Sequence, residues 1–277
     1  MTIRKLTTED RARAQALWLH IFRDSPAFTA YYFDNRFFPE HSFGAFDGED
    51  LVAMVLGRPT RIFVNGAFFD ALLISGVSTL LRYRRKGLMR RLMTLLLDHA
   101  KDSGFACCYL HPVEESIYRS LGFQNGTDAR IIRSDTARAH NAFELREGTA
   151  WDDLLTVYQA VLLTHDGMQQ RDAEEFRTVF SDYATENART LIAYAKHEPV
   201  GYIVFNGEGD VSELLALRPS AYAFLLDEAA KRAGQELTAA VPADCGLSGE
   251  RVYSMQYLVF DDAFSLPLKN GFCQVPY

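Results

Sequence analysis

The sequence predicts an α/β protein, more closely α+β, that consists of two tandem domains. Each domain is expected to hold a mixed, mostly antiparallel sheet flanked by helices, and the second domain is expected to be degenerate. Three observations support this prediction. Stretches with helical spacing of apolar residues alternate with short strand-like runs. The order of these segments in the first half of the chain recurs in the second half. The chain has 277 residues, which is enough for two modest domains.

Two helices are predicted near the N-terminus. Thr7 and Asp10 have the spacing of a capping box, and apolar residues follow them at helical spacing. Ser25-Pro26 predicts the start of the second helix, because proline is favoured in the first helical turn. Helical spacing places most aromatic side chains of this region in the core, although some could roof a ligand pocket. These aromatic residues are Phe28, Tyr31, Tyr32, Phe33, Phe37 and Phe38.

An antiparallel meander is predicted next. Residues 43–46 and 51–56 have the composition of strands and are separated by the turn Asp47-Gly48. The dipeptide Asn65-Gly66 predicts a second hairpin. The apolar run 71–81 then predicts a buried strand.

A basic turn follows this strand and leads into a long helix. The turn is Arg84-Arg85-Lys86-Gly87-Leu88-Met89, and the helix is predicted over residues 88–100. A further strand over residues 105–110 and a short helix over residues 115–121 complete the first half.

The turn has the features of an anion site. A strand that runs through a turn into a helix gathers unpaired backbone N–H groups and the positive end of the helix dipole. Arg84, Arg85 and Lys86 add charge, and Gly87 lets a pyrophosphate approach the backbone. The alternative is a solvated loop that Gly87 merely shapes, and an isolated motif of this length would favour that alternative.

An internal repeat relates the two halves. Residues 191–205 have the strand-turn-strand form of residues 43–56, and residues 211–215 echo residues 77–81. Each copy continues with a helix, a strand and a proline. We infer two domains of related topology.

The boundary between the domains is predicted from composition. Two helical stretches, residues 152–163 and 173–183, precede the second meander, as two precede the first. Polar residues and small alanines interrupt the pattern near residues 136–142. We therefore expect an N-terminal domain over residues 1–138 and a degenerate domain over residues 139–277.

The two copies differ at the turn. Where the first copy has Arg84-Arg85-Lys86-Gly87, the second has Arg218-Pro219-Ser220-Ala221. Proline lacks a backbone N–H group, and the glycine that permits close approach is absent. Only the first copy is expected to hold a phosphate group.

Composition narrows the function classes. The net charge of −7 makes the general surface a poor match for nucleic acid, and a cationic substrate fits it better. No run of about 18 apolar residues and no apolar signal core occur, so we expect a cytoplasmic protein without a membrane partner. The cysteines show no metal-ligand spacing, and we expect buried thiols and no metal. They are Cys107, Cys108, Cys245 and Cys273.

The order of strand, basic turn, long helix, strand and short helix resembles the GCN5-related N-acetyltransferases (GNAT). Their coenzyme A motif is (Gln/Arg)-x-x-Gly-x-(Gly/Ala), and Arg84 and Gly87 match it, whereas Met89 departs from it. The segment from Ile117 to Phe123, with Tyr118 and Gly-Phe, resembles the end of the same fold. The sequence around Met89 and the tandem degenerate second domain look like the Eis-like branch of this superfamily.

The resemblance implies an acetyl-CoA-dependent N-acetyltransferase that transfers acetyl to a primary amine of a small molecule or peptide. It implies that the turn residues Arg84 to Met89 bind the cofactor. It also implies that backbone groups of Val77, Ser78 and Thr79 contact the pantetheine and the thioester carbonyl. Eis-type proteins usually carry a third, sterol-carrier-like domain, which we expect this chain to lack.

The resemblance also implies catalytic residues. Tyr118 takes the place of the family's general acid, and the alternative is a helix residue that packs beside Phe123. Eis-type enzymes are thought to use the C-terminal carboxylate as the base, which here belongs to Tyr277. Glu114 and Glu115 are competing bases, and the alternative for them is a solvated charge pair at a helix start.

The sequence is also compatible with a function other than catalysis. An acyl-CoA sensor that binds the cofactor without turnover is the alternative to an enzyme. The acceptor is unidentified, as is any contribution of the second domain to its pocket. A homo-oligomer is compatible with the sequence.

Overall fold

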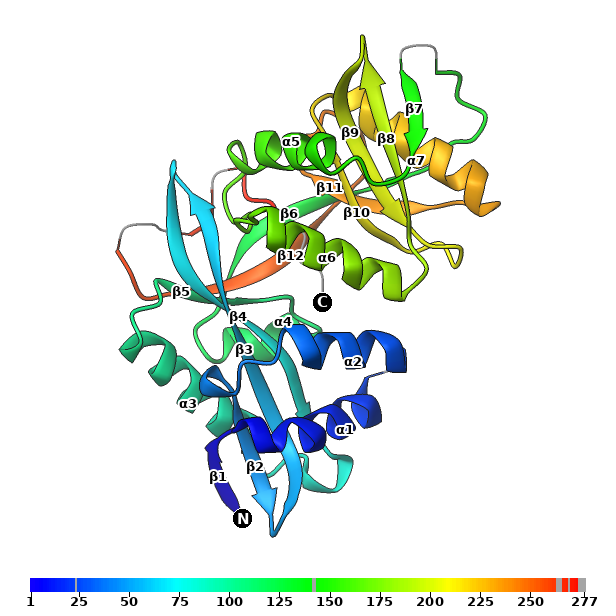
Figure 1. The fold of residues 1–277 in the computed structure, drawn as a ribbon. Coiled ribbons are helices and arrows are strands. Elements are labelled where there is room, and N and C mark those ends of the chain that lie inside the picture. The colour runs from blue at the N-terminus through cyan, green and yellow to red at the C-terminus, as the bar shows by residue number, and fades with distance from the viewer. Residues whose placement is uncertain (23, 141–142, 263–265, 269, 274–277) are drawn as a thin grey trace.

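The computed structural model describes residues 1–277 with the exception of residues 23, 141–142, 263–265, 269 and 274–277. It confirms the α/β fold class. Figure 1 shows two lobes: the first half of the chain forms the lower one and most of the second half forms the upper one. Long strands run between the lobes and join them.

The first half follows the predicted order of elements. Its helices are α1 (Arg11–Ile21), α2 (Pro26–Asn35), α3 (Leu88–Asp102) and α4 (Glu115–Arg119). Its strands are β1 (Thr2–Lys5), β2 (Phe43–Asp47), β3 (Asp50–Val64), β4 (Ala67–Thr79), β5 (Cys107–Leu110) and β6 (Gln124–Arg133). Short 3₁₀ turns lie at Thr8–Asp10, Pro39–His41 and Leu81–Tyr83.

The second half repeats this order. Its helices are α5 (Trp151–Leu162), α6 (Ala173–Thr185) and α7 (Pro219–Ala233). Its strands are β7 (Glu144–Glu147), β8 (Arg189–Ala195), β9 (Glu198–Phe205), β10 (Val211–Ala216), β11 (Thr238–Pro242) and β12 (Glu250–Val259).

The sequence features predicted to start the two N-terminal helices lie close to the observed helix starts. The capping box of Thr7 and Asp10 is present, but it closes the 3₁₀ turn, and α1 begins only at Arg11. Ser25 caps α2, because its side chain accepts the backbone N–H of Phe28 at 3.0 Å.

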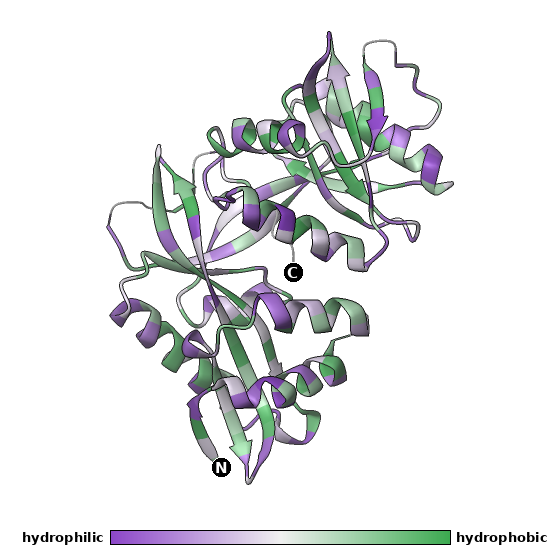
Figure 2. Ribbon diagram, in the orientation of Figure 1, coloured by the Kyte–Doolittle hydropathy of each residue, from purple (hydrophilic) through white to green (hydrophobic). Residues whose placement is uncertain are grey.

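Helices cover both faces of each sheet (Figure 1). On β3, Met54 and Leu56 face α1 and α2, whereas the alternating residues Ala53 and Val55 face α3. The second half repeats this layering, with α5 and α6 on one face of β8 and β9 and α7 on the other. Figure 2 shows the apolar residues on the inward sides of these helices and strands.

The strand order crosses the two halves. One sheet has the order β1-β2-β3-β4-β5-β12-β6-β11, and the other has the order β10-β9-β8-β7. Strand β12 lies between β5 and β6, and β6 pairs with β11. The second half therefore contributes β11 and β12 to the eight-stranded sheet, whereas the four strands of the other sheet all lie in the second half. A domain division between residues 138 and 139 stays a prediction, and such a cut would separate strands that are hydrogen-bonded to each other.

Two further features concern the described part of the chain. The four cysteines are buried, as predicted. Among the described residues, no helix is both long and apolar enough to cross a membrane.

Candidate functional site

The candidate site begins at a bulge in β4. The register between β3 and β4 shifts between Met54 and Leu56, and Gly76 on the opposite strand has a left-handed φ of +58°. A Cβ on Gly76 would lie 2.8 Å from Cζ3 of Trp18. Glycine thus allows both the backbone angle and the close packing, and the bulge bends β4 at this point.

The sheet opens beyond this bend. β4 and β5 are parallel neighbours only from Ala71 to Leu73, which pair with Cys107 to Tyr109. β4 continues to Thr79 with β3 as its remaining neighbour in the described structure. Backbone N–H and C=O groups on the open side of a strand are free to bind a ligand as a further strand would. The residues expected to contact the pantetheine, Val77, Ser78 and Thr79, lie in this open stretch.

The basic turn follows directly from the open stretch. Nε of Arg84 donates to the carbonyl oxygen of Thr79 at 3.1 Å, which ties the turn to the end of β4. Arg85 and Gly87 have φ angles of +60° and +74°, so the chain reverses twice before α3 begins at Leu88.

The first turn of α3 presents free donors. Gly87 is the N-cap, and no side chain caps the helix. The first N–H groups of such a helix lack partners within the helix and favour an anion. Nothing lies within 4 Å of a Cβ built on Gly87, so its surroundings are open and its positive φ is the reason for glycine.

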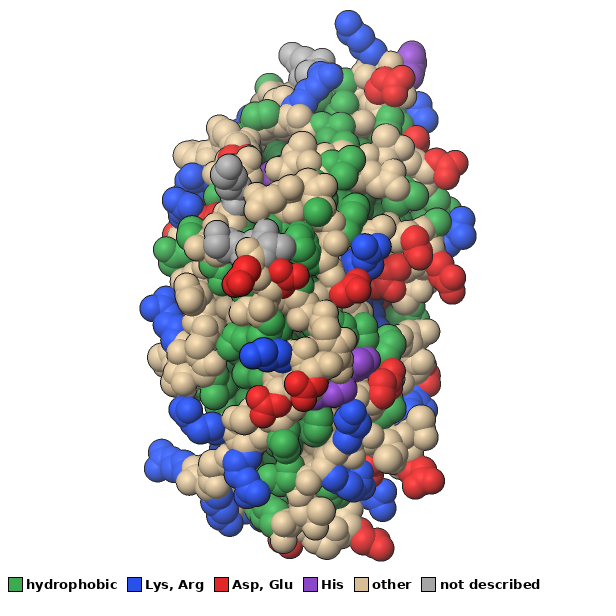
Figure 3. Space-filling model, turned by 90° about the vertical axis from the view of Figure 1, so that its left-hand side faces the viewer, with side chains coloured by type: hydrophobic (Ala, Val, Ile, Leu, Met, Phe, Trp, Pro, Cys, Tyr) green, Lys and Arg blue, Asp and Glu red, His purple; other side chains and the backbone are tan. Residues whose placement is uncertain are grey.

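The side chains of the turn supply positive charge. Arg84, Arg85 and Lys86 are exposed, whereas Leu88 is buried and Met89 is half-buried against the core. Lys86 also lies over the ring of Tyr83, with Nζ 5.0 Å from the ring centroid. On the α3 side of the molecule, many Lys and Arg side chains gather over the lower lobe (Figure 3).

Ser78 is the polar side chain of the open strand that lacks a partner. It is 5% exposed, and its Oγ is buried without a hydrogen bond to any described residue. An unpaired buried hydroxyl costs free energy unless a ligand or water satisfies it. This observation fits a strand that receives a ligand.

Tyr118 lies on α4 beside the first turns of α3. It is 8% exposed and belongs to the same apolar cluster as Leu88 and Leu92. Its ring packs edge-on against Phe123, with centroids 6.1 Å apart. Burial raises the pKa of the phenol, and no hydrogen bond to its hydroxyl is present among the described residues. A raised pKa keeps the group protonated and able to donate.

The two candidate bases on α4 are engaged locally. Glu114 caps the helix and accepts the Ser116 hydroxyl at 2.9 Å. Glu115 forms an ion pair with Arg119 at 2.7 Å. These contacts agree with the alternative to a catalytic role, a solvated charge pair at the start of a helix. Tyr277, the third candidate base, lies outside the described residues.

One polar contact next to the bulge was not predicted. The Tyr32 hydroxyl lies 2.6 Å from Oγ of Ser75, the residue before Gly76. Tyr32 belongs to the aromatic group of α2, and it is buried with Phe28 and Phe33 as helical spacing predicted. Its hydroxyl links α2 to the open strand.

The junction between the halves carries buried charges that were also missed. Arg36, at the end of α2, pairs with Asp182 of α6 at 2.9 Å, and both side chains are 2% exposed. Burial raises the pKa of Asp182 to about 6 although Arg36 and Arg58 oppose this shift. The sequence did offer a signal, because Asp182 lies on the apolar face of an amphipathic helix beside Tyr183, where a carboxylate needs a partner.

Fold and site together define a class of protein. A sheet that opens beside a basic, uncapped helix start suits an extended ligand with a phosphate group at one end. Residues 2–126 match a family model described as "Acetyltransferase (GNAT) domain". This part of the chain is similar to the GNAT acetyltransferases.

A comparison with other sequences agrees with this assignment. The chain is 34% identical over 101 residues to an uncharacterized N-acetyltransferase from Streptomyces avermitilis. The match covers 36% of this chain and only 24% of that protein.

Solved structures share the fold over most of the chain. A probable N-acyltransferase of unknown function from Enterococcus faecalis has a TM-score of 0.73 at 17% identity. The match covers 93% of this chain and 72% of that chain. A GCN5-related N-acetyltransferase from Anabaena variabilis has a TM-score of 0.72 at 15% identity, with the same coverages. Eis1 from Mycobacterium abscessus has a TM-score of 0.70 at 17% identity, and the match covers 94% of this chain and 74% of Eis1. The Eis-like arrangement of the fold is thereby confirmed.

Proposed function

We propose that this protein is an acetyl-CoA-dependent N-acetyltransferase that acetylates a primary amine of a small molecule or peptide. The observation that carries the proposal is the continuity of the open strand with the uncapped basic turn, within a GNAT domain. A basic turn alone would accept any phosphate. The adjoining open strand adds unpaired backbone groups for an extended arm that contains amides and ends at the bulge.

Several residues are proposed to bind the cofactor. The N–H groups at the start of α3, from Gly87 to Met89, would hold the pyrophosphate, and Arg84, Arg85 and Lys86 would neutralise its charge. The open backbone from Val77 to Thr79 would pair with the amides of the pantetheine, as a strand does. Acetyl-CoA supplies an activated acyl group, and it is a substrate that requires no metal.

The chemistry requires two proton transfers. The neutral amine attacks the thioester carbonyl, the C–N bond forms, and the C–S bond breaks as the thiolate leaves. A base takes the proton of the amine, and an acid gives a proton to the sulfur. We assign the acid to Tyr118, whose burial favours the protonated phenol.

The base is proposed to be the C-terminal carboxylate of Tyr277. Glu114 and Glu115 remain the competitors, and their local contacts with Ser116 and Arg119 weigh against them. Activity of a chain without Tyr277 distinguishes the two cases. Loss of transfer with intact cofactor binding supports the carboxylate of Tyr277. Because a chain without Tyr277 still ends in the carboxylate of Pro276, the base is assigned to α4 if a chain shortened to Cys273 also keeps its transfer activity.

The acceptor and the setting are proposed more broadly. A cationic amine suits the net charge of −7, and buried thiols suit a reducing cytoplasm. Neither nucleic acid nor a membrane is proposed as a partner, and a homo-oligomer is compatible with the proposal.

A cofactor-binding experiment tests the proposal. Saturating acetyl-CoA should raise the melting temperature, because a ligand at a hundredfold excess over its Kd adds about 2.7 kcal/mol of stability. Arg84→Ala combined with Gly87→Asp should abolish this shift. An unchanged melting temperature of the wild type would refute the cofactor assignment. Cofactor binding without transfer to any amine of a broad panel would favour the sensor.

A further inference from the structure

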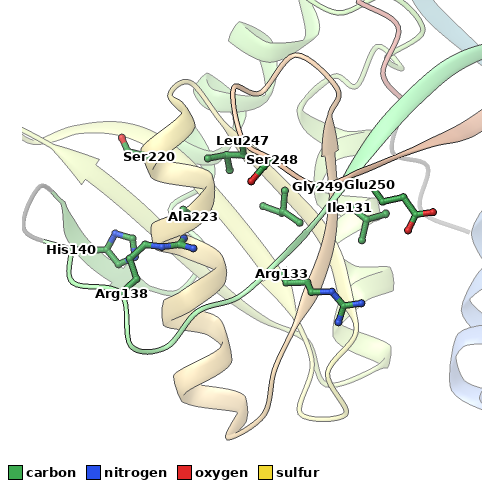
Figure 4. Close-up of a pocket in the computed structure, with 11 residues that line it drawn as sticks. Ile131, Arg133, Arg138, His140, Ser220, Ala223, Leu247, Ser248, Gly249 and Glu250 are labelled. Atoms are coloured by element: carbon green, nitrogen blue, oxygen red, sulfur yellow. The ribbon is translucent and has the colours of Figure 1, made fainter.

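A cavity of about 570 Å³ lies in the second half, away from the site proposed for acetyl-CoA (Figure 4). It lies between the first turns of α7, the end of β6 and the loop that joins β11 to β12. A volume of this size is typical of sites for small molecules. None of the residues proposed to bind acetyl-CoA lines it.

The repeat explains why this cavity exists. In the first half, residues 111–123 connect β5 to β6 and include α4, so that Tyr118 and Phe123 pack on α3. In the second half, residues 243–249 connect β11 to β12, and this fully described stretch contains turns in place of a helix. The space that α4 fills in the first half is therefore left open in the second.

Two apolar positions confirm the correspondence. Ala223 is the fifth residue of α7, as Leu92 is the fifth residue of α3. Ile132 of β6 pairs with Ala239 of β11 and faces α7, and Leu258 of β12 likewise pairs with β5 and faces α3. Leu92 and Leu258 pack in one apolar cluster with Phe123. Ala223 and Ile132 line the cavity.

The polar side of the cavity is held in place by a buried carboxylate. Asp227 of α7 is 0% exposed and accepts three hydrogen bonds. The donors are Nη1 of Arg138 at 3.1 Å, Nε2 of His140 at 2.7 Å and the backbone N–H of Asp135 at 2.6 Å. These bonds fix the loop that follows β6. Figure 4 shows Arg138 and His140 projecting from this loop towards α7.

Arg138 keeps donors for a ligand. Its side chain is 41% exposed, and only Nη1 is used in the hydrogen bond to Asp227. A guanidinium has five N–H donors in a planar fork that suits carboxylate geometry. Asp227 is shielded behind the cavity wall, so a ligand meets the guanidinium first.

The charges around the cavity are balanced. Arg133, Arg138 and Glu250 line it, and the carboxylates of Asp227 and Asp135 lie 3.1 Å and 3.9 Å from the guanidinium of Arg138. The ion pair of Arg133 with Glu236 is exposed, with side chains 72% and 61% accessible, and such pairs are weak. The exposed N–H donors of Arg138 are therefore the feature that suits a carboxylate, and the apolar wall suits a short apolar body behind it.

We propose that this cavity is a second ligand site, which binds a small organic carboxylate. Arg138 contacts the carboxylate, and Ile132 and Ala223 contact the apolar body. Ser220 and Ser248 line the cavity and add hydroxyl groups. The site stands in the half that lacks the glycine turn, and it is independent of acetyl transfer.

Ligand-observed NMR with phenylacetate as the probe tests this proposal on the full chain. Phenylacetamide is the neutral counterpart and phenethylamine the cationic one. Phenylacetate should bind at least about tenfold more tightly than the amide, because a charge-assisted hydrogen bond is lost in the amide. Equal binding of the three compounds, or no binding of phenylacetate at millimolar concentration, would overturn the proposal.

Three variants locate the binding. Ala223→Leu fills the cavity and leaves the pair of Arg138 and Asp227 intact, so it should abolish binding. Arg138→Gln should weaken phenylacetate binding about tenfold and leave amide binding unchanged. Arg232→Gln, on the same helix but paired with Glu228, is the control and should change nothing. Binding that survives both cavity variants with an unchanged melting temperature would place the ligand elsewhere and refute the site.

Discussion

The two halves share one topology, but the backbone before the central helix has a different conformation in each half. Before α3, Arg85 and Gly87 take positive φ angles, and the helix begins without a side-chain cap. Before α7, Arg218 is extended, with a φ of −145°, and Pro219 occupies the first turn. Proline removes an N–H group at the place where the first half offers one. A repeated fold thus keeps its architecture while it loses the backbone features of the proposed anion site.

The strand before the helix shows the same contrast. β4 is open beyond its bulge, and Ser78 has no described partner there. The corresponding strand β10 carries Glu213, whose carboxylate pairs with Arg171 at 3.0 Å and accepts the Tyr183 hydroxyl at 3.2 Å. Both charged side chains are at most 1% exposed. The second half thus carries a buried ion pair on this strand, where the first half has a buried hydroxyl without a described partner.

The largest expected effect concerns this ion pair. Glu213→Leu removes the carboxylate that faces Arg171 in the core, and breaking a buried pair on one side costs about 3 to 5 kcal/mol. Urea denaturation should show this loss of unfolding free energy, with acetyl-CoA binding retained wherever the chain is still folded. A loss below about 1 kcal/mol would mean that the pair does not stabilise the second half.

The next effect separates chemistry from binding in the first half. Tyr118→Phe keeps the ring that packs on Phe123 and removes the proposed acid, so kcat should fall about a hundredfold or more. The Kd for acetyl-CoA should stay the same. Tyr158→Phe is the matched control, since Tyr158 is a buried tyrosine of the second half. An unchanged kcat in Tyr118→Phe would leave Tyr118 as a packing residue.

A smaller effect is expected from making the first turn more like the second. Gly87→Ala should raise the Kd for acetyl-CoA and lower stability by about 1 to 2 kcal/mol, because a left-handed φ is unfavourable for alanine. Gly104→Ala has a similar φ of +82° and open surroundings at the other end of α3. It should cost similar stability and leave the Kd unchanged. If the Kd for acetyl-CoA were the same in Gly87→Ala and Gly104→Ala, the proposed role of the turn in cofactor binding would be contradicted.

The smallest effect concerns acid stability, and it should be confined to the first half. Nδ1 of His41 and Nε2 of His99 lie 3.0 Å apart, and burial lowers both pKa values, with Lys5 adding to the shift. A lowered folded pKa means that the unfolded chain binds protons first as the pH falls below about 6.5. The contribution of this pair to stability should therefore decrease from pH 7.5 to pH 5, whereas protonation of Asp182, whose folded pKa is raised to about 6, changes the stability of the junction with the opposite sign.

Hydrogen exchange localises this acid effect. After correction for intrinsic rates, protection of α3 should decrease on acidification more than protection of α7, whose last turn carries Lys231 and Arg232 and no histidine. The double variant His41→Asn with His99→Gln should flatten the pH dependence. A loss of protection that is the same in both helices would contradict a local origin.

Local signals predicted the elements well. A proline and a glycine predicted the helix starts at Pro26 and Leu88, and apolar runs predicted the buried strands. The capping box was placed correctly but closes a 3₁₀ turn, because a cap fixes the chain direction and not the type of the first turn. The basic turn proposed to bind the cofactor could be recognised in the sequence because its residues are contiguous.

Contacts between distant segments were not predicted. Tyr32 meets Ser75, and Arg36 meets Asp182, across more than forty and more than one hundred residues of chain. Nothing local marks such partners, because any buried charge needs an opposite charge but the sequence does not say which one. The position of β12 between β5 and β6 was missed for the same reason, since strands of similar composition can pair in several ways.

The sequence by itself determined the α/β class and the repeat, and it indicated the turn that we propose to hold an anion, because periodicity and backbone preferences act over a few residues. Only the tertiary structure decided that β12 lies between β5 and β6, that Glu213 pairs with Arg171 in the core of the second half, and that a shortened loop leaves a cavity over α7. These features depend on which surfaces meet when the two halves pack. Burial and pairing across the fold set them, and no local pattern records that choice.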